Sequence, residues 1–159
     1  MSGMLIVGAG LAGLTVAETL RAEGYAGPVT LLGAEPHAPY QRPPLSKGFL
    51  LGETAEAQLM MRTAEAMEKK NILLKVGAGV TAIERGAKQV TLSNGSTLAY
   101  DGLALCTGAR LRPLPLAGAS LGGVFGLRSL DDSRAIKAAL DTAQNVVIIG
   151  GGFIGLEVA

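Results

Sequence analysis

The chain has 159 residues, of which 48% are hydrophobic, and this apolar fraction suffices for one sizeable core. Fourteen Lys and Arg against thirteen Asp and Glu give a net charge of +1, so no overall field would steer the protein towards nucleic acid or a membrane surface. Aromatic residues make up only 4%, which disfavours a nucleic-acid binder that works by base stacking. We therefore expect no nucleic-acid partner.

The cysteine content also limits the possibilities. Cys106 is the single cysteine, so the chain has neither an internal disulfide nor a CxxC redox or zinc motif, and we expect no metal site. The N-terminus lacks a basic signal-peptide region, and no apolar stretch approaches the length of a membrane span. These features predict a soluble protein in a reducing, cytoplasmic setting, with no membrane partner.

The first residues predict a strand, a helix and a second strand. The run at 4–7 is short, apolar and bounded by Gly8, as a strand buried on both faces should be. Residues 14–23 carry helix formers and end at Gly24, and a second apolar run follows at 29–32. This order predicts a βαβ unit, whose parallel strands need the helix as a crossover.

The middle of the chain predicts a proline-stiffened loop and a group of short strands. Four prolines between 33 and 44 favour an extended, rigid loop over a regular element. Asn94-Gly95 predicts a hairpin, because both residues tolerate positive φ. We expect an antiparallel meander inserted into a parallel α/β domain. The predicted elements are a helix at 63–70, a strand at 72–76, and the meander strands at 80–84, 89–92 and 97–100.

The last third predicts one more buried strand, a crossing and a helix. The strand candidate at 103–106 ends at Thr107-Gly108, and 110–115 forms an irregular segment with prolines. A helix is expected at 131–140, with Ser129 and Asp132 placed as a capping box. The run at 146–149 predicts another strand before a new glycine cluster. Because the chain then stops inside a helix, we expect the natural product to continue.

The first glycine motif lies between a predicted strand and a predicted helix. Gly8 permits a tight turn, Gly10 lets the backbone approach a pyrophosphate at the helix N-terminus, and Gly13 allows close helix packing. Glu35 follows the next strand, where a carboxylate accepts hydrogen bonds from ribose hydroxyls. With strand, helix and acidic residue in register, a dinucleotide site is favoured over a chance glycine cluster.

A second motif of the same spacing is formed by Gly150, Gly152 and Gly155. Two such motifs predict two nucleotide sites rather than an additional turn in one domain. Which dinucleotide occupies which site does not follow from the glycines.

A longer set of segments resembles one known family. The segment 39–47 reads PYQRPPLSK, and it is accompanied by LALCTG at 103–108, LRSL at 127–130 and the closing GGGFIGLEVA. Together they resemble the FAD-dependent ferredoxin reductases of bacterial oxygenase systems, in the pyridine nucleotide-disulfide oxidoreductase superfamily. The resemblance implies a glutathione reductase-like α/β fold: a Rossmann-like FAD-binding domain at 1–115 with an inserted meander, then a linker and the start of an NAD(P)-binding domain at 116–159.

The resemblance also implies which residues contact the cofactors. The FAD pyrophosphate would meet the first glycine loop, and a guanidinium fork suits phosphate or ribityl oxygens. Cys106 stands where the family usually has alanine, which changes packing. The implied FAD contacts are Gly8, Gly10, Leu11, Ala12, Gly13, Glu35 at the ribose, Arg42, Arg128, Val80 at the adenine, Thr107 and Gly108; Gly150, Gly152 and Gly155 would hold NADH or NADPH.

Lys47 and Glu157 are the candidate catalytic residues. The resemblance implies that the Lys47 ammonium lies near the N5 and O4 edge of the flavin and pairs with Glu157, where a cation stabilises the negative charge of reduction. The alternatives are an exposed lysine at the start of a short helix and a solvated glutamate. His37, the single histidine, is given no role.

The resemblance implies a reductase that takes hydride from NADH or NADPH on FAD and passes single electrons to a [2Fe-2S] ferredoxin serving a P450 or ring-hydroxylating oxygenase. Exposed basic residues such as Arg62 would help docking. The alternatives are a rubredoxin-linked or nitrite reductase-linked NADH reductase, and a signalling flavoprotein resembling apoptosis-inducing factor. We expect residues 1–159 alone to be inactive.

Overall fold

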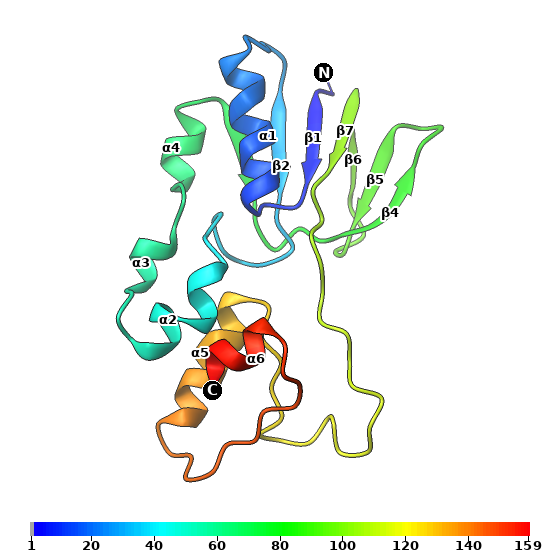
Figure 1. Ribbon diagram of the computed structural model, residues 1–159. Coiled ribbons are helices and arrows are strands. Elements are labelled where there is room, and N and C mark those ends of the chain that lie inside the picture. The colour runs from blue at the N-terminus through cyan, green and yellow to red at the C-terminus, as the bar shows by residue number, and fades with distance from the viewer. Residues whose placement is uncertain (1) are drawn as a thin grey trace. The chain divides into compact units, whose positions relative to one another are not determined.

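A computed structural model describes residues 2–159 of the chain (Figure 1). These residues form two compact units, each built from two segments. Within the described residues, the first unit comprises 2–40 and Met60–Gly108, and the second comprises Gln41–Leu59 and Ala109–Ala159. The structure is thus a mixed α/β protein with a parallel and an antiparallel sheet, as the sequence predicts.

The parallel sheet of the first unit has the strand order β3-β2-β1-β7. All three pairings in it are parallel, and Met4 of β1 lies between Val29 of β2 and Gly102 of β7. This arrangement confirms the predicted βαβ unit, with α1 as the crossover between β1 and β2. The elements are β1 (Met4–Val7), α1 (Leu11–Ala22), β2 (Val29–Leu32), β3 (Ile72–Lys75) and β7 (Gly102–Leu105).

Both faces of this sheet are covered, which explains the continuous apolar runs of its strands. Ile6 and Leu31 face α1 and α4 (Ala64–Glu68), where they join a buried cluster with Leu14 and Met67. The alternate residues of the same strands face the antiparallel sheet β4-β5-β6. That second cluster contains Leu5, Val7, Leu32, Val90, Leu92 and Tyr100.

The antiparallel sheet confirms the predicted meander. It consists of β4 (Val80–Glu84), β5 (Gln89–Leu92) and β6 (Thr97–Ala99), with β5 in the centre. The turn between β5 and β6 is the predicted one: Gly95 has a φ of 83°, and the Asn94 Oδ1 atom accepts a hydrogen bond from the Ser96 amide at 3.0 Å. The side chain of Asn94 and the freedom of glycine therefore close this hairpin.

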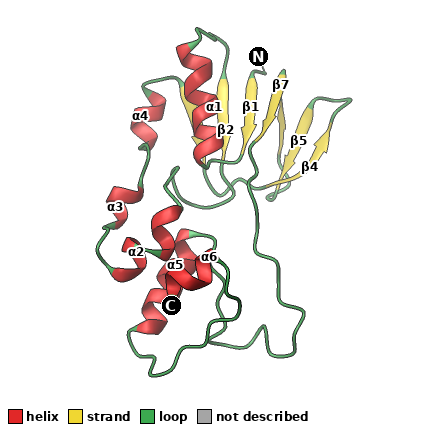
Figure 2. Ribbon diagram, in the orientation of Figure 1, coloured by secondary structure: helices red, strands yellow, loops and turns green. Residues whose placement is uncertain are grey.

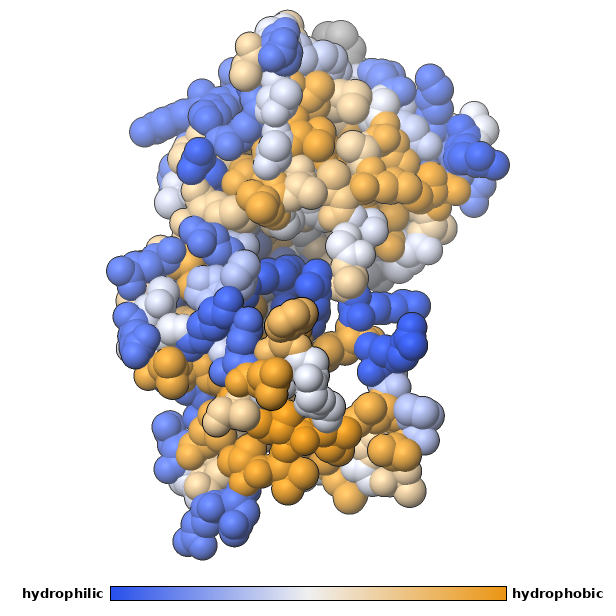
Figure 3. Space-filling model, viewed as in Figure 1, coloured by the Kyte–Doolittle hydropathy of each residue, from blue (hydrophilic) through white to orange (hydrophobic). Residues whose placement is uncertain are grey.

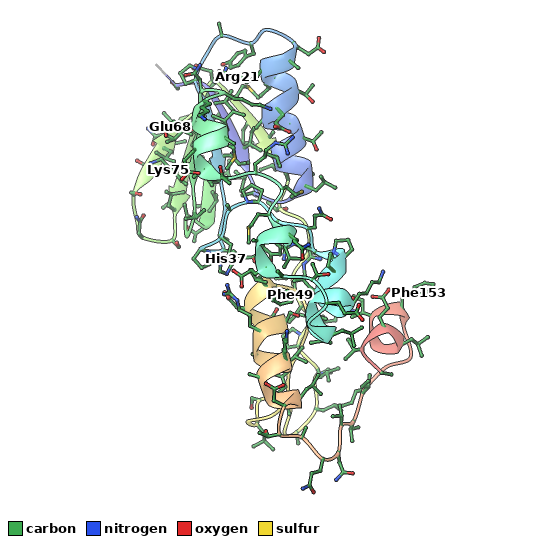
Figure 4. All side chains as sticks on the ribbon, turned by 90° about the vertical axis from the view of Figure 1, so that its left-hand side faces the viewer. Arg21, His37, Phe49, Glu68, Lys75 and Phe153 are labelled. Carbon is green, nitrogen blue, oxygen red and sulfur yellow. The ribbon has the colours of Figure 1, made fainter. Side chains whose placement is uncertain are left out.

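Arg21 joins the end of α1 to the turn before β3 (Figure 4). Its Nε and Nη2 atoms donate to the Lys70 and Asn71 carbonyls, and its Nη1 atom donates to the carbonyls of Tyr25 and Gly27. A planar guanidinium suits this role because it carries five donors in a fixed fork. One side chain thus ties two connections of the first unit together.

The second unit contains helices and loops but no strand within the described residues (Figure 2). Its elements are the 3-10 helix η1 (Pro43–Ser46), α2 (Gly48–Leu51), α3 (Glu56–Leu59), α5 (Leu130–Leu140) and α6 (Phe153–Val158). The prediction of a loop through Pro44 is wrong at its end, because Pro43 and Pro44 begin η1. Proline fits the first turn of a helix, where its missing N–H would have no partner.

The capping box before α5 is confirmed. The Ser129 Oγ atom accepts from the Asp132 amide at 3.1 Å, and the Asp132 carboxylate accepts from the Ser129 amide at 2.7 Å. Leu130 and Ser133 are fully buried, where α5 packs against η1 and α2. The cap therefore fixes the start of the helix on which the second unit is assembled.

The predicted strand at 146–149 does not form. An isolated strand leaves its backbone groups unpaired, and the described part of the second unit offers no neighbouring strand to pair with. Val147 is 86% exposed, and Phe153 of α6 is 88% exposed. Figure 3 shows apolar residues on the visible surface of this unit. None of the helices in the described part is long and apolar enough to cross a membrane.

A close backbone approach in the first unit joins α1 to the turn after β1. A Cβ atom built on Gly13 would lie 1.9 Å from the Gly8 carbonyl oxygen and 3.1 Å from the Leu31 Cδ1 atom. The first of these contacts is with backbone, so no side chain can rotate away to make room.

Gly13→Ala should therefore lower the free energy of unfolding by about 1 to 3 kcal/mol, as overpacking does, despite the better helix propensity of alanine. Gly86→Ala is the matched control, because a Cβ there meets nothing within 4 Å. Urea denaturation of both variants provides the measurement. Equal midpoints would show that α1 can move away from β1 without cost.

Candidate functional site

The turn after β1 lies where the strand order reverses. The chain runs from β1 to β2 on one side, and β7 lies on the other side of β1. In open α/β sheets, such a position leaves a crevice at the carboxyl ends of the strands, where ligands bind. Gly8 has a φ of 114°, and a Cβ on it would lie 2.0 Å from the Cys106 carbonyl oxygen. Only glycine suits both the turn and the close approach to the end of β7.

The N-terminus of α1 offers backbone donors. Gly10 is the N-cap, no side chain caps this end, and the first turn has no acidic residue. The first hydrogen bond within the helix is donated by the Leu14 amide to the Gly10 carbonyl at 3.0 Å, so the amides of Leu11, Ala12 and Gly13 precede it. A Cβ on Gly10 would meet nothing within 4 Å. The loop therefore leaves open space beside donors, which fits a diphosphate.

Glu35 lies in the loop after β2, and its carboxylate accepts a hydrogen bond from the Tyr40 hydroxyl at 2.5 Å. Tyr40 is only 5% exposed, so its ring is fixed in the first unit. The Glu35 carbonyl accepts from the Gly77 amide at 3.0 Å, which holds the backbone as well. The sequence did not identify Tyr40 as the partner of Glu35, although it lies in the segment PYQRPPLSK. His37 packs edge-on against the Tyr40 ring.

The remaining predicted residues of the first unit lie at strand ends. Val80 is the half-buried first residue of β4 and pairs with Leu92. Thr107 and Gly108 follow β7, and Gly108 has a φ of 64°. Cys106 packs against the core on the helix side of the sheet. Across residues 2–159, no three His, Cys, Asp or Glu side chains are grouped to hold a metal ion.

Arg62 is engaged in an ion-pair cluster of the first unit. Its Nε atom lies 2.9 Å from a Glu18 carboxylate oxygen, and the Lys70 Nζ atom lies 2.7 Å from the same oxygen. These contacts hold the pKa of Glu18 below its usual value, chiefly through the hydrogen bond from Lys70. Arg62 thus links α1 to the segment that precedes α4.

In the second unit, the structure brings Arg42 and Arg128 together. The Arg42 Nη1 atom donates to the Arg128 carbonyl at 2.8 Å. The Arg128 side chain donates from Nε to the Ala109 carbonyl at 2.9 Å, and its backbone amide donates to Asp132 at 3.0 Å. The capping box thus holds the backbone of Arg128. The hydrogen bond from Arg42 to the Arg128 carbonyl joins the two arginines.

Lys47 and Glu157 are also paired within the second unit. The Lys47 Nζ atom lies 3.3 Å from the Glu157 Oε1 atom, and the Ser46 hydroxyl donates to the Oε2 atom at 2.5 Å. The two partners lower the pKa of Glu157, first through the hydrogen bond from Ser46 and then through Lys47. Sequence reasoning did not identify Ser46, although it directly precedes Lys47 in the chain.

The second glycine loop repeats the local geometry of the first. Gly150 has a φ of 108°, Gly152 is the N-cap of α6, and a Cβ on Gly155 would lie 2.4 Å from the Gly150 carbonyl oxygen. The corresponding distance between Gly13 and Gly8 is 1.9 Å. As in the first loop, a Cβ on the middle glycine would meet nothing within 4 Å. The glycine spacing thus produces the same turn twice.

Comparison with known proteins agrees with this geometry. The putidaredoxin reductase CamA of Pseudomonas putida is 46% identical over 159 residues, which cover 98% of this chain and 38% of the relative. The rubredoxin-NAD(+) reductase of Pseudomonas putida is 43% identical over 156 residues, which cover 98% of this chain and 40% of the relative. The chain therefore spans about two fifths of the length of these relatives.

A solved structure of similar fold is the covalent putidaredoxin reductase-putidaredoxin complex. It matches with a TM-score of 0.89 and 46% identity, over 99% of this chain and 38% of the matched chain. Residues 3–159 match the family described as pyridine nucleotide-disulphide oxidoreductase. The protein thus belongs to the pyridine nucleotide-disulphide oxidoreductases.

Proposed function

We propose that the protein is a flavoprotein reductase that transfers electrons from NADH or NADPH through FAD to a [2Fe-2S] ferredoxin serving a P450 or a ring-hydroxylating oxygenase. The observation that carries this proposal is the uncapped N-terminus of α1 beside the open Gly10 position, in a chain whose relatives are named as reductases of such small redox proteins. The single cysteine agrees with a cytoplasmic setting.

In this proposal, residues 1–115 contribute to the FAD-binding domain and 116–159 begin the NAD(P)-binding domain. The amides of Leu11, Ala12 and Gly13 would hold the FAD pyrophosphate, because a helix N-terminus stabilises an anion. Glu35 would accept hydrogen bonds from the ribose hydroxyls, with Tyr40 holding its carboxylate. Val80, Thr107 and Gly108 would contact the same cofactor.

Bound FAD supplies the chemistry, since it accepts a hydride and releases electrons one at a time. The chain's own residues orient the cofactor and adjust the local charge. Arg42 and Arg128 would meet its phosphate or ribityl oxygens, where a guanidinium suits an anionic oxygen. Gly150, Gly152 and Gly155 would hold the nicotinamide dinucleotide through the second loop.

Lys47 and Glu157 are the proposed catalytic residues. The role rests on the resemblance of the segment around Lys47 and is supported by the ion pair between the two side chains. An ammonium beside the isoalloxazine would stabilise the negative charge that develops on reduction, and the paired carboxylate would hold it in place.

A rubredoxin is the second candidate for the electron acceptor, because one relative at 43% identity is named as a rubredoxin reductase. The complete polypeptide with bound FAD, mixed with NADH and cytochrome c, separates the two acceptors. We expect fast cytochrome reduction when a [2Fe-2S] ferredoxin is added and little when a rubredoxin is added. Faster cytochrome reduction with rubredoxin than with ferredoxin would make rubredoxin the acceptor. Slow cytochrome reduction with both proteins would contradict the proposed reductase function.

Gly10→Val should weaken FAD binding about tenfold or more, since the side chain would occupy the space beside the helix amides and prevent charge-assisted hydrogen bonds. The protein should still fold, because a Cβ at this position meets no neighbour within 4 Å. Gly152→Val is the matched control in the second loop, and it should weaken NADH binding while leaving FAD affinity unchanged. Fluorescence titration of the apoprotein with FAD measures the effect. If Gly152→Val lost FAD affinity and Gly10→Val did not, FAD would belong to the second glycine loop and the nicotinamide dinucleotide to the first.

Lys47→Met should slow reduction of the bound flavin about tenfold and lower its reduction potential, because the substitution keeps the length of the side chain and removes its charge. Lys88→Met, on the exposed turn between β4 and β5, is the control and should change neither value. Stopped-flow absorbance and a spectroelectrochemical titration give the two quantities. If both values matched those of the unaltered protein, Lys47 would have no catalytic role.

A further inference from the structure

Ser46 is a buried polar residue that the proposed function does not use. It is 7% exposed, and its hydroxyl donates to the Glu157 Oε2 atom at 2.5 Å. This distance is typical of a hydroxyl that donates to an ionised carboxylate. The Lys47 ammonium contacts the other oxygen at 3.3 Å, so each carboxylate oxygen has its own partner.

The two partners of Glu157 differ in how firmly they are held. Ser46 ends η1, whose Leu45 carbonyl accepts a hydrogen bond from the buried Ser133 hydroxyl at 2.7 Å. Residue Arg42, just before η1, donates to the Arg128 carbonyl at 2.8 Å. The backbone that carries Ser46 is therefore tied at both ends to the region of α5 and its cap. The Lys47 side chain, by contrast, is 55% exposed.

An ion pair as exposed as that of Lys47 and Glu157 does not hold two side chains in one geometry by itself. Exposed pairs contribute little, because ordering two long side chains costs entropy and solvent screens the charges. A second anchor on the carboxylate removes part of that freedom. The short side chain of Ser46 provides such an anchor, since it has only one rotatable bond before its hydroxyl.

We propose that Ser46 is a positioning residue that orients the Glu157 carboxylate and, through it, holds the Lys47 ammonium in place. This inference rests on the proposed function only where it concerns the flavin. The chain of contacts is Ser133 to the Leu45 carbonyl, then Ser46 to Glu157, and finally Glu157 to Lys47. A buried serine on a hydrogen-bonded helix thereby determines the position of an exposed cation.

The electrostatics of Glu157 agree with this role. The hydrogen bond from Ser46 is the largest cause of its lowered pKa, ahead of the contributions of Lys47. Glu157 is the single charged side chain of α6. The helix η1 packs against α6, and Lys47, which directly follows η1, is the charged residue next to Glu157. With a lowered pKa in the folded protein, the carboxylate stays charged and paired at neutral pH, and the contact is lost as the pH falls through that pKa.

The test is the reactivity of the Lys47 amine in the complete protein, measured by brief acetylation with acetic anhydride and mass spectrometry. Ser46→Ala should raise the acetylation rate of Lys47 at least about twofold relative to Lys88, because the ion pair loosens. Ser46→Thr keeps the hydroxyl and should restore the original rate. Ser120→Ala, which removes an exposed hydroxyl from the same unit, is the control and should have no effect. An unchanged Lys47 rate in Ser46→Ala would overturn the proposal.

A double-variant comparison separates positioning from general loosening. Glu157→Gln should raise the acetylation rate of Lys47 at least as much as Ser46→Ala does, and adding Ser46→Ala to Glu157→Gln should change nothing further, because Ser46 acts through Glu157. Additive effects would contradict the proposed order of contacts.

Carbon-13 NMR of the Glu157 carboxyl tests the inference with Ser46 intact, even if Ser46→Ala does not fold. In Lys47→Met, the midpoint of titration should stay below that of an ordinary glutamate, since the serine still donates. If the midpoint rose to that of an ordinary glutamate, Lys47 and not Ser46 would be the cause of the lowered pKa of Glu157, and the proposal would be wrong.

The rate of flavin reduction by NADH in Ser46→Ala distinguishes a failure of this inference from a failure of the proposed function. If Ser46→Ala raises the reactivity of Lys47 and also slows flavin reduction by NADH, both stand. If it raises the reactivity of Lys47 and leaves flavin reduction unchanged, the positioning role stands and the catalytic role of Lys47 falls.

Discussion

The structure of the first unit depends on one close contact, between the start of α1 and the turn after β1. Gly13 approaches the Gly8 carbonyl so closely that no side chain fits, and Gly8 in turn approaches the Cys106 carbonyl at the end of β7. The helix, the central strand and the neighbouring strand are therefore locked at one point. The same contact places the first turn of α1 beside the carboxyl ends of the strands, where open α/β sheets bind ligands, so packing and the proposed FAD binding share one origin.

The second unit relies on side chains rather than on a sheet. The capping box fixes the start of α5, Ser133 on α5 holds η1, and η1 presents Ser46 and Lys47 to Glu157 on α6. The capping box is local, whereas the contacts of Ser133, Ser46 and Lys47 join residues far apart in the sequence. Short helices of four to six residues have little stability by themselves, so the unit depends on these contacts together with buried apolar residues such as Phe49 and Leu130.

Much of the fold could be predicted from the sequence where local signals were strong. The parallel strands, the meander, the Asn94-Gly95 turn and the capping box at Ser129 were all predicted correctly, because apolar periodicity, turn chemistry and capping act over a few neighbouring residues. The partners of candidate site residues were harder to foresee. Tyr40 at Glu35 and Ser46 at Glu157 were missed, since a hydroxyl in a sequence does not reveal which carboxylate it will reach.

The two glycine loops separate what the sequence determines by itself from what tertiary structure decides. Gly8 and Gly150 adopt nearly the same φ, and both loops turn into a helix in the same way, because glycine spacing acts through local backbone sterics. The apolar runs before them are equally suited to form strands, yet only residues 4–7 form one. A strand exists only where neighbours complete its hydrogen bonds, and β2 and β7 provide them for β1. The turn is therefore a property of the sequence, whereas the strand is a property of the assembled sheet.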